Sequence, residues 1–290
     1  MLVTAKELLM EAEKRKCAVG AFNVPNLESL RGVIQAAEML EVPVIIQHAE
    51  VHENLIRLEE IGPVMIHYAK LAKVPVAVHL DHGSSLDACV KAIRMGFTSI
   101  MYDASLKDYE TNVKETTELV KIAHSVDVSV EAELGEMTNS AIGSGEGRES
   151  ELGAFGNKDL FTNPDQARSF VASTKVDSLA ISFGTVHGKY FTEPELDFQR
   201  ISAIRSATNN FPLVMHGGSG VSDEDYKLAI DAGIRKINYY TYMNLAAGTA
   251  VKMEASKRQN KELFFDALAL KATAAIKENI CGALRIFNHL

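Results

Sequence analysis

Cysteine is scarce in this chain, with only Cys17, Cys89 and Cys281 among 290 residues. An odd number at such wide spacing excludes a disulfide framework and a Cys-x-x-Cys metal site. We expect all three to be small buried side chains that behave as apolar groups. Reduced cysteines are typical of an intracellular protein, and we expect the cytoplasm as the location.

Long apolar runs and basic clusters are also missing. No stretch of about 18 apolar residues is present, so no membrane-spanning helix and no membrane partner are expected. The first residues, 1–7, lack a positively charged start followed by an apolar stretch, so no signal peptide is expected. Thirty Lys and Arg face 38 Asp and Glu, a formal net charge of −8, which argues against nucleic acid as a partner.

Helical and strand patterns alternate along the whole chain. With 47% hydrophobic residues the sequence can bury a large core. Alternation of this kind predicts an α/β fold in which parallel strands close into a (β/α)8 TIM barrel. We expect one domain over 1–290, with additional helices that continue without a break from about Tyr242. The eight predicted strands are short apolar runs at 19–23, 42–47, 74–80, 98–102, 128–133, 178–183, 212–216 and 235–238.

A doubly wound open sheet is the alternative fold. Such sheets often carry a Gly-x-Gly-x-x-Gly turn after the first strand. Here the first strand is followed by Asn23-Val-Pro-Asn26, which contains no glycine. The barrel is therefore the favoured fold.

One long segment, 137–157, has no helical or strand pattern and is rich in glycine and glutamate. Loops of this length inside a compact domain are often functional. Because it follows a predicted strand, it belongs to the C-terminal face of the barrel, where such enzymes carry their active sites. We expect a mobile active-site loop, with a surface insertion as the alternative.

At or shortly after the end of three predicted strands stands a histidine followed directly by glycine: His82, His187 and His216. The C-terminal strand ends of a barrel converge on one mouth, so these side chains are expected to face one another. Three imidazoles and one open position form a catalytic zinc site. A single histidine in such a place is more often a core or surface residue, but three favour the metal site. Cobalt, manganese or iron would also suit these ligands.

Carboxylates stand beside the predicted metal site. Asp81 adjoins His82 at a strand end and is the candidate for general acid–base catalysis, or alternatively for orienting a histidine ligand. Asp103 and Glu133 end two further strands and could hold a second cation or orient a ligand. His79 lies deeper in its strand, and we expect it to support the site rather than bind the metal.

The loops after the last two strands are predicted to bind phosphate. Residues 217–220 read Gly-Gly-Ser-Gly, and 238–241 read Asn-Tyr-Tyr-Thr. In such barrels the corresponding loops commonly bind phosphate through backbone N–H groups at the start of a helix. A Gly-Gly-Ser-Gly sequence by itself could be a tight turn, but here it follows a predicted metal-binding histidine.

Together these motifs resemble the class II, metal-dependent aldolases of fructose- and tagatose-bisphosphate type. The matching segments are Gly20–Asn23, His79–Gly83, Glu131–Gly135, Gly184–Gly188, His216–Gly220 and Lys236–Asn238. The resemblance implies a lyase of carbohydrate metabolism, such as glycolysis, that reversibly cleaves a ketose (bis)phosphate to dihydroxyacetone phosphate and an aldehyde. It also implies a homodimer or homotetramer.

The resemblance further implies roles for individual residues. One zinc ion is expected on His82, His187 and His216, with Asp81 as the catalytic acid–base. A loop glutamate serves the family as a second base, and Glu146 is the nearest match. The ketose phosphate and an accompanying Na⁺ or K⁺ are expected at Asn23, Gly188, Gly217, Gly218, Ser219, Asn238 and Thr241.

The chain also departs from the family. The turn after the second strand reads Gln-His-Ala-Glu-Val-His at 47–52, and tyrosines flank the Asn-x-x-Thr motif. The segment linked to the distal phosphate has no clear counterpart in 261–277, and Arg258 is the nearest basic candidate. We therefore expect an aldolase whose substrate could lack a distal phosphate, such as a ketose 1-phosphate. A zinc hydrolase and a non-catalytic barrel subunit are less favoured alternatives.

Overall fold

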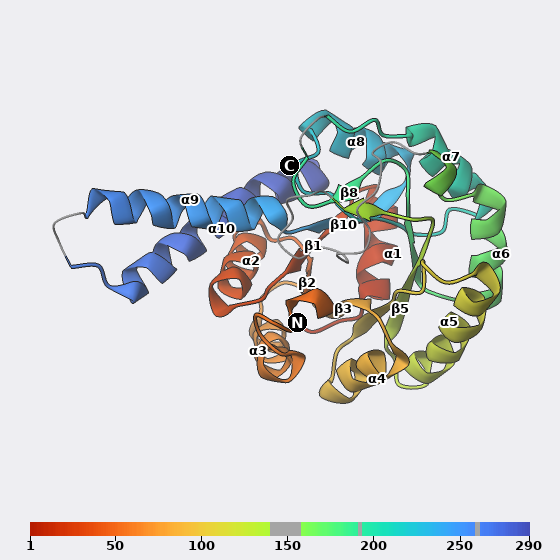
Figure 1. Cartoon of the computed structure of the whole chain (residues 1–290), viewed down its shortest axis with the longest axis horizontal. Coiled ribbons are helices and arrows are strands. Elements are labelled where there is room, and N and C mark those ends of the chain that lie inside the picture. Colours follow the sequence, from red (N-terminus) through yellow and green to blue (C-terminus); the bar gives the residue numbers. More distant parts are fainter. Residues whose placement is uncertain (140–157, 191–192, 259–261) are drawn as a thin grey trace.

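Eight parallel strands close into a barrel in the computed structural model (Figure 1), which describes residues 1–139, 158–190, 193–258 and 262–290. The order around the barrel is β1-β10-β9-β7-β5-β4-β3-β2, so the predicted (β/α)8 fold is confirmed. The barrel strands are β1 (Val19–Asn23), β2 (Val44–Ala49), β3 (Val76–Gly83), β4 (Ser99–Tyr102), β5 (Ser129–Leu134), β7 (Ser178–Ile181), β9 (Leu213–Met215) and β10 (Ile234–Tyr239).

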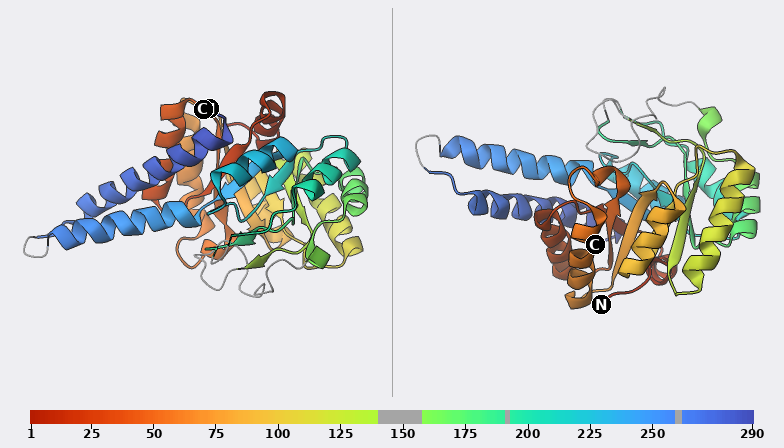
Figure 2. Two further views of the ribbon diagram at one scale, coloured as in Figure 1. Left: turned by 90° about the horizontal axis from the view of Figure 1, so that it is seen from above. Right: turned by 60° about the horizontal axis from the view of Figure 1, so that its bottom comes forward.

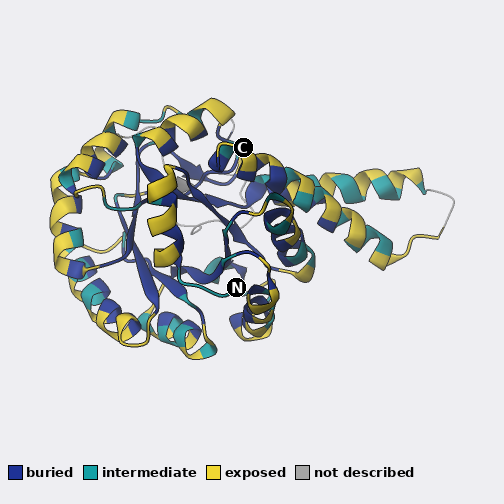
Figure 3. Ribbon diagram, turned by 180° about the vertical axis from the view of Figure 1, so that it is seen from behind, coloured by how far each residue is buried: buried dark blue, intermediate teal, exposed yellow. Residues whose placement is uncertain are grey.

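Helices form a ring around the barrel, with their outer faces exposed and the strands buried (Figure 3). The helices of the described residues are α1 (Ala5–Arg15), α2 (Leu27–Leu40), α3 (Leu58–Leu71), α4 (Leu86–Met95), α5 (Tyr109–His124), α6 (Pro164–Thr174), α7 (Phe198–Ala207), α8 (Asp223–Ala232), α9 (Thr241–Lys257) and α10 (Phe265–Phe287), with single 3-10 turns at Glu50–His52 and Lys158–Leu160. No helix in these described ranges is both long enough and apolar enough to cross a membrane.

Local sequence signals mark the ends of several helices. Thr4 and Glu7 form a reciprocal capping box at the start of α1, because each side chain bonds to the other's backbone N–H. Ser85 caps α4, which ends at Gly96 with a φ of 97°. Proline at the first position of α6 follows the capping residue Asn163.

Helix α1 closes the N-terminal end of the barrel. Its residues Leu8 and Leu9 pack against the interior side chains Ala21, Ile45 and Ala77 in a small apolar cluster. The larger apolar core lies between the barrel and the outer helices. One end of the barrel interior is thus dry and apolar, and the polar side chains of the interior lie on the side away from α1.

Two parts of the fold differ from the prediction. The additional C-terminal helices are present, but they do not continue without a break: α9 and α10 are separate helices that pack side by side and project together from the barrel as an arm (Figure 2). In addition, β6 (Thr138–Asn139) and β8 (Val186–His187) form a separate two-stranded sheet that was not predicted. Two-residue strands carry too little periodicity to be recognised in a sequence.

Candidate metal centre and active site

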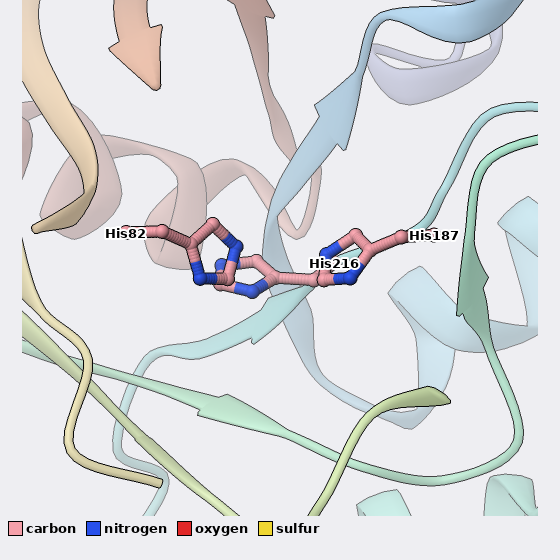
Figure 4. A group of neighbouring side chains, drawn as sticks. All are labelled: His82, His187 and His216. Carbon is pink, nitrogen blue, oxygen red and sulfur yellow. The ribbon is translucent and has the colours of Figure 1, made fainter. Parts of the chain in front are cut away.

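The three histidines predicted to bind metal lie together at the C-terminal end of the barrel (Figure 4). His82 belongs to β3, His187 ends β8, and His216 follows β9 directly. One ring nitrogen from each lies within 4.8 Å of the others, and all three side chains are buried. His82 is central, since its ring centroid lies 5.1 Å from that of His187 and 4.7 Å from that of His216.

An irregularity in β3 brings Asp81 and His82 to the same site. Neighbouring strand residues normally point to opposite faces. The register with β4 shifts between Leu80 and Gly83, and His82 has a φ of 49°, in the left-handed region. This local break turns His82 towards the interior, which Asp81 already faces.

Carboxylates fix the orientation of two of the rings. His82 Nδ1 lies 2.8 Å from Asp103 Oδ2, and His216 Nε2 lies 3.0 Å from Glu131 Oε1. Because an ionised carboxylate only accepts hydrogen bonds, each of these nitrogens carries the proton. In the neutral ring that binding a cation requires, His82 would therefore present Nε2 as its lone pair, and His216 would present Nδ1.

The lone pairs lack hydrogen-bond partners. His82 Nε2, His216 Nδ1 and Glu133 Oε2 are buried without a hydrogen bond, although the last two atoms are 2.9 Å apart. Buried polar atoms of this kind are rare unless an ion or water satisfies them. Imidazole nitrogens with a carboxylate oxygen are a donor set that suits a divalent transition metal. His82, Asp103 and Glu133 also form a second group with ligand spacing. The role predicted for Asp103 and Glu133, in holding a second cation or orienting a ligand, stays a prediction.

The charges around the histidines perturb their pKa values in opposite directions. Burial lowers the pKa of His82, but the nearby carboxylates, Asp81 and Asp103 foremost, outweigh it and raise the value to about 10. Burial together with the positive charges of His82 and His216 holds the pKa of His187 well below its usual range. The carboxylates thus favour positive charge at the site, while repulsion between the rings prevents all three from being protonated together. These electrostatics suit a bound cation.

Asp81 is held by two amide donors. Asn23 Nδ2 donates to one carboxylate oxygen at 3.0 Å, and Asn238 Nδ2 donates to the other at 3.1 Å. Burial raises the pKa of Asp81, but the charges of His82, His216 and Lys236 outweigh it and lower the pKa to about 2. The side chain is therefore an ionised base in a fixed position. Gln47 Nε2 in turn donates to Asn23 Oδ1 at 2.5 Å and fixes that amide's orientation.

The predicted phosphate loops lie next to each other. Gly218 N donates to Asn238 O at 3.2 Å, and Tyr240 N donates to Ser219 Oγ at 2.8 Å, so the two loops are joined. Gly217 has a φ of 60°, and a Cβ there would collide with the carbonyl of Val186. Helix α9 begins at Thr241, beside these loops, so the positive end of its dipole lies at the predicted phosphate site. Gly188 also has a positive φ, of 95°.

A buried ion pair, for which no role was predicted, lies beneath the site. Lys236 Nζ donates to both oxygens of Glu131, and His79, as expected of a supporting residue, bonds to Ser99 Oγ at 2.7 Å. The signal was present: Glu131 and Glu133, like Lys236 and Asn238, are two residues apart on one strand and so share the interior face.

Other predicted site residues fall in different places. Glu146 and nearly all of the predicted active-site loop lie outside the described residues, so their roles stay predictions. Arg258 directly follows the end of α9 and bonds to Glu254. That end of α9 is the one distant from the barrel (Figure 1). In the divergent turn after β2, the ring of His52 lies against that of Tyr240, with centroids 4.9 Å apart.

Comparison with known proteins identifies the family. The model of the class II fructose-bisphosphate aldolases matches residues 3–289. The chain belongs to this family. Fructose-bisphosphate aldolase from Thermus caldophilus is 37% identical over 99% of this chain and 98% of its own length. The crystal structure of the YdjI aldolase from Escherichia coli K12 superposes with a TM-score of 0.84 at 35% identity, over 99% of this chain and 97% of that one.

Family membership confirms the enzyme class. The chain is an aldolase of class II, a lyase, and the family is generally metal-dependent. A sugar phosphate is consistent with the substrates of this family. A probable fructose-bisphosphate aldolase from Bacillus subtilis, 37% identical over 99% of this chain and 97% of its own length, belongs to the same group.

Proposed function

We propose that the chain is a zinc-dependent aldolase that reversibly cleaves a ketose phosphate to dihydroxyacetone phosphate and an aldehyde. The observation that carries this proposal is the buried lone pairs of His82 and His216 beside the fixed carboxylate of Asp81. A scaffold protein would have no need for an arrangement that costs stability in the absence of a ligand.

His82, His187 and His216 would hold the cation, with Glu133 beside it. When bound, a divalent cation supplies Lewis-acid polarisation of the ketose carbonyl. Three protein ligands leave room for substrate oxygens, as in other catalytic zinc sites. Asp103 contributes by fixing the ring of His82.

Asp81 would act on the proton. In cleavage it accepts the proton of the C4 hydroxyl while the C3–C4 bond breaks, and in aldol addition it returns that proton to the aldehyde oxygen. Two amide donors keep its oxygens in place, so little reorganisation is needed. Glu146 is proposed as the loop group that exchanges the proton at C3.

The joined loops at 217–220 and 238–241 would bind the phosphate of the dihydroxyacetone half. Their backbone N–H groups and the start of α9 supply donors and a favourable dipole. Asn23, Gly188, Ser219 and Thr241 complete the proposed substrate site, and a Na⁺ or K⁺ would accompany the phosphate.

We propose further that the preferred aldehyde carries no phosphate, so that the substrate is a ketose 1-phosphate. Arg258, the nearest basic candidate for a distal phosphate, lies on the distant part of the arm and bonds to Glu254 at 2.8 Å. The divergent turn after β2 instead contributes His52, whose ring is tilted by 57° against that of Tyr240. A ketose bisphosphate is the alternative substrate.

A cleavage assay over a substrate panel tests both parts of the proposal. The panel is fructose 1,6-bisphosphate, tagatose 1,6-bisphosphate and a series of ketose 1-phosphates, each with and without a chelator. We expect zinc-restorable activity that is highest on a 1-phosphate. Strong preference for a bisphosphate would contradict the acceptor assignment alone. Chelator-resistant activity, or no exchange of a dihydroxyacetone phosphate proton with solvent, would contradict the proposed chemistry.

The proposed enzyme is a homodimer or homotetramer in the cytoplasm, with the barrel and arm as one domain. Support for the compartment is the state of the cysteines: Cys17, Cys89 and Cys281 are all buried free thiols. Support for the oligomer is the apolar surface of the arm, on which Phe265 is 80% exposed.

A further inference from the structure

A buried ion pair in the barrel interior supports the ring of His216. Lys236 Nζ lies 2.9 Å and 2.8 Å from the two oxygens of Glu131, and Glu131 Oε1 lies 3.0 Å from His216 Nε2. Lys236, Glu131 and His216 are at most 1% exposed. The three groups form a continuous chain from β10 through β5 to the residue after β9.

The hydrogen-bond partners of Glu131 determine the geometry of its carboxylate. Lys236 binds both oxygens, and Ser178 Oγ donates to Oε2 at 3.3 Å, so the carboxylate plane cannot rotate freely. Its Oε1 is therefore held at His216 Nε2. An acceptor at Nε2 keeps the proton on that nitrogen, so in the neutral ring that binds a cation the lone pair is on Nδ1, the nitrogen that lies 2.9 Å from Glu133 Oε2.

We propose that Lys236 and Glu131 are positioning residues that fix the tautomer and orientation of His216 for cation binding. This inference rests on the proposed metal site. Carboxylates that accept from metal-binding histidines commonly tune affinity. Here the lysine adds a second step, because it anchors the carboxylate that anchors the histidine.

The carboxylate that orients His82 is held in a different way. There Asp103 accepts from the backbone N–H of Ser105 at 3.1 Å and from its hydroxyl at 2.7 Å, within one turn of chain. The anchor of Glu131, by contrast, comes from another strand, β10. A buried charge needs a partner of opposite sign, which is why the anchor is an ammonium group.

A purely structural ion pair is the alternative, and it makes a different prediction. Such a pair would affect folding but would leave the affinity of the folded protein for zinc unchanged. Metal affinity and the state of the His216 ring therefore separate the two roles.

The test uses full-length Lys236→Met and Glu131→Gln, and the double variant, which removes both buried charges and so leaves neither unpaired. Lys121→Met, an exposed lysine on α5, is the matched control. Zinc dissociation constants are measured by competition with a chelating dye on protein shown to be folded by circular dichroism. The Nε2–H of His216 is followed by NMR in zinc-loaded protein with ¹⁵N-labelled histidine.

We expect zinc affinity about 10–100-fold weaker in whichever of the three interior variants folds, loss of the Nε2–H signal, and no change in Lys121→Met. Unchanged affinity and an unchanged signal in a folded interior variant would overturn the inference and leave the proposed function standing. If wild-type protein fails to bind zinc in a one-to-one ratio, or His82→Ala binds it equally well, the proposed metal site itself is wrong.

Discussion

Asp81 illustrates how single residues in this site depend on their neighbours. Its carboxylate accepts hydrogen bonds from the side-chain amides of Asn23 and Asn238. Gln47 donates to the oxygen of the Asn23 amide and so orients the nitrogen of that amide towards Asp81. The base is thus held by a hydrogen-bond network in which each member fixes the next. Networks of this kind position a group without any movement at the moment of reaction.

Replacing Asp81 with Asn should abolish the proton transfer while preserving the shape of the site. An amide cannot accept the C4 hydroxyl proton, so we expect kcat to fall about 100–10,000-fold. Zinc affinity should fall far less than in His82→Ala, because Asp81 is not one of the proposed ligands. Steady-state cleavage kinetics and a zinc titration measure the two effects.

Asp127→Asn is the matched control for this substitution. Asp127 is exposed, follows α5 on the opposite side of the barrel, and has a φ of 57° that asparagine tolerates well. Its kcat should equal that of the wild type. A kcat for Asp81→Asn within tenfold of this control would show that another group transfers the proton.

Single site residues could be recognised in the sequence where a distinctive residue stands next to them. His82, His187 and His216 each precede a glycine at a strand end, and the structure brings them together. Lys236 and Glu131 have no such distinctive neighbour. Strand alternation places each side chain on the interior face, but only the closure of the barrel brings β10 and β5 to a common interior. The kink at His82 was equally hidden, since a register shift arises from pairing with the next strand.

Among the elements, the Gly217 loop is the most constrained connection of the site. Gly217 has a φ of 60°, and a Cβ added there would lie 2.3 Å from the carbonyl oxygen of Val186 in β8. We expect Gly217→Ala to displace this loop, raise KM for the phosphate substrate at least tenfold, and lower the free energy of unfolding by about 1–3 kcal/mol. Saturation kinetics and urea unfolding measure these effects.

Gly248→Ala is the corresponding control, because the same change falls in the interior of α9 where no atom lies within 4 Å of the new Cβ. There alanine should stabilise the helix by about 0.5–1 kcal/mol and leave KM unchanged. An unchanged KM in Gly217→Ala would argue that the substrate phosphate binds elsewhere.

Element boundaries show what periodicity can and cannot predict. The ends of helix α8 carry local sequence signals, because Ser222 caps its start and Gly233 follows its last residue. Strands β2 and β3 begin two residues later than predicted, since Val42 and Val74 are buried apolar residues that precede the paired segments. Hydrophobicity reports burial, whereas the start of a strand depends on its hydrogen-bonding neighbour.

For the whole molecule, alternation of strands and helices sufficed to predict the barrel, because few folds accommodate eight such units. The arm was not predicted in its observed form. The region after Tyr242 is helical throughout most of its described length, and nothing in its pattern shows that α10 turns back to pack along α9 and α2. Chain reversal of this kind is decided by tertiary contacts.

The surface of the arm leads to a prediction about assembly. Phe264 is 61% exposed, Phe265 is 80% exposed, and Leu270 on the same helix is 59% exposed. Neighbouring exposed apolar residues of this size are typical of association surfaces. In light scattering, we expect the wild-type protein to have at least twice the 31.7 kDa mass of one chain. The double variant Phe264→Ser/Phe265→Ser should shift the measured mass towards 31.7 kDa.

Leu71→Ser is the control. Leu71 is 70% exposed on α3, and the variant should keep the wild-type mass, because this leucine lies on the barrel rather than the arm. An unchanged mass in the double variant with a circular dichroism spectrum like that of the wild type would assign the association to another surface.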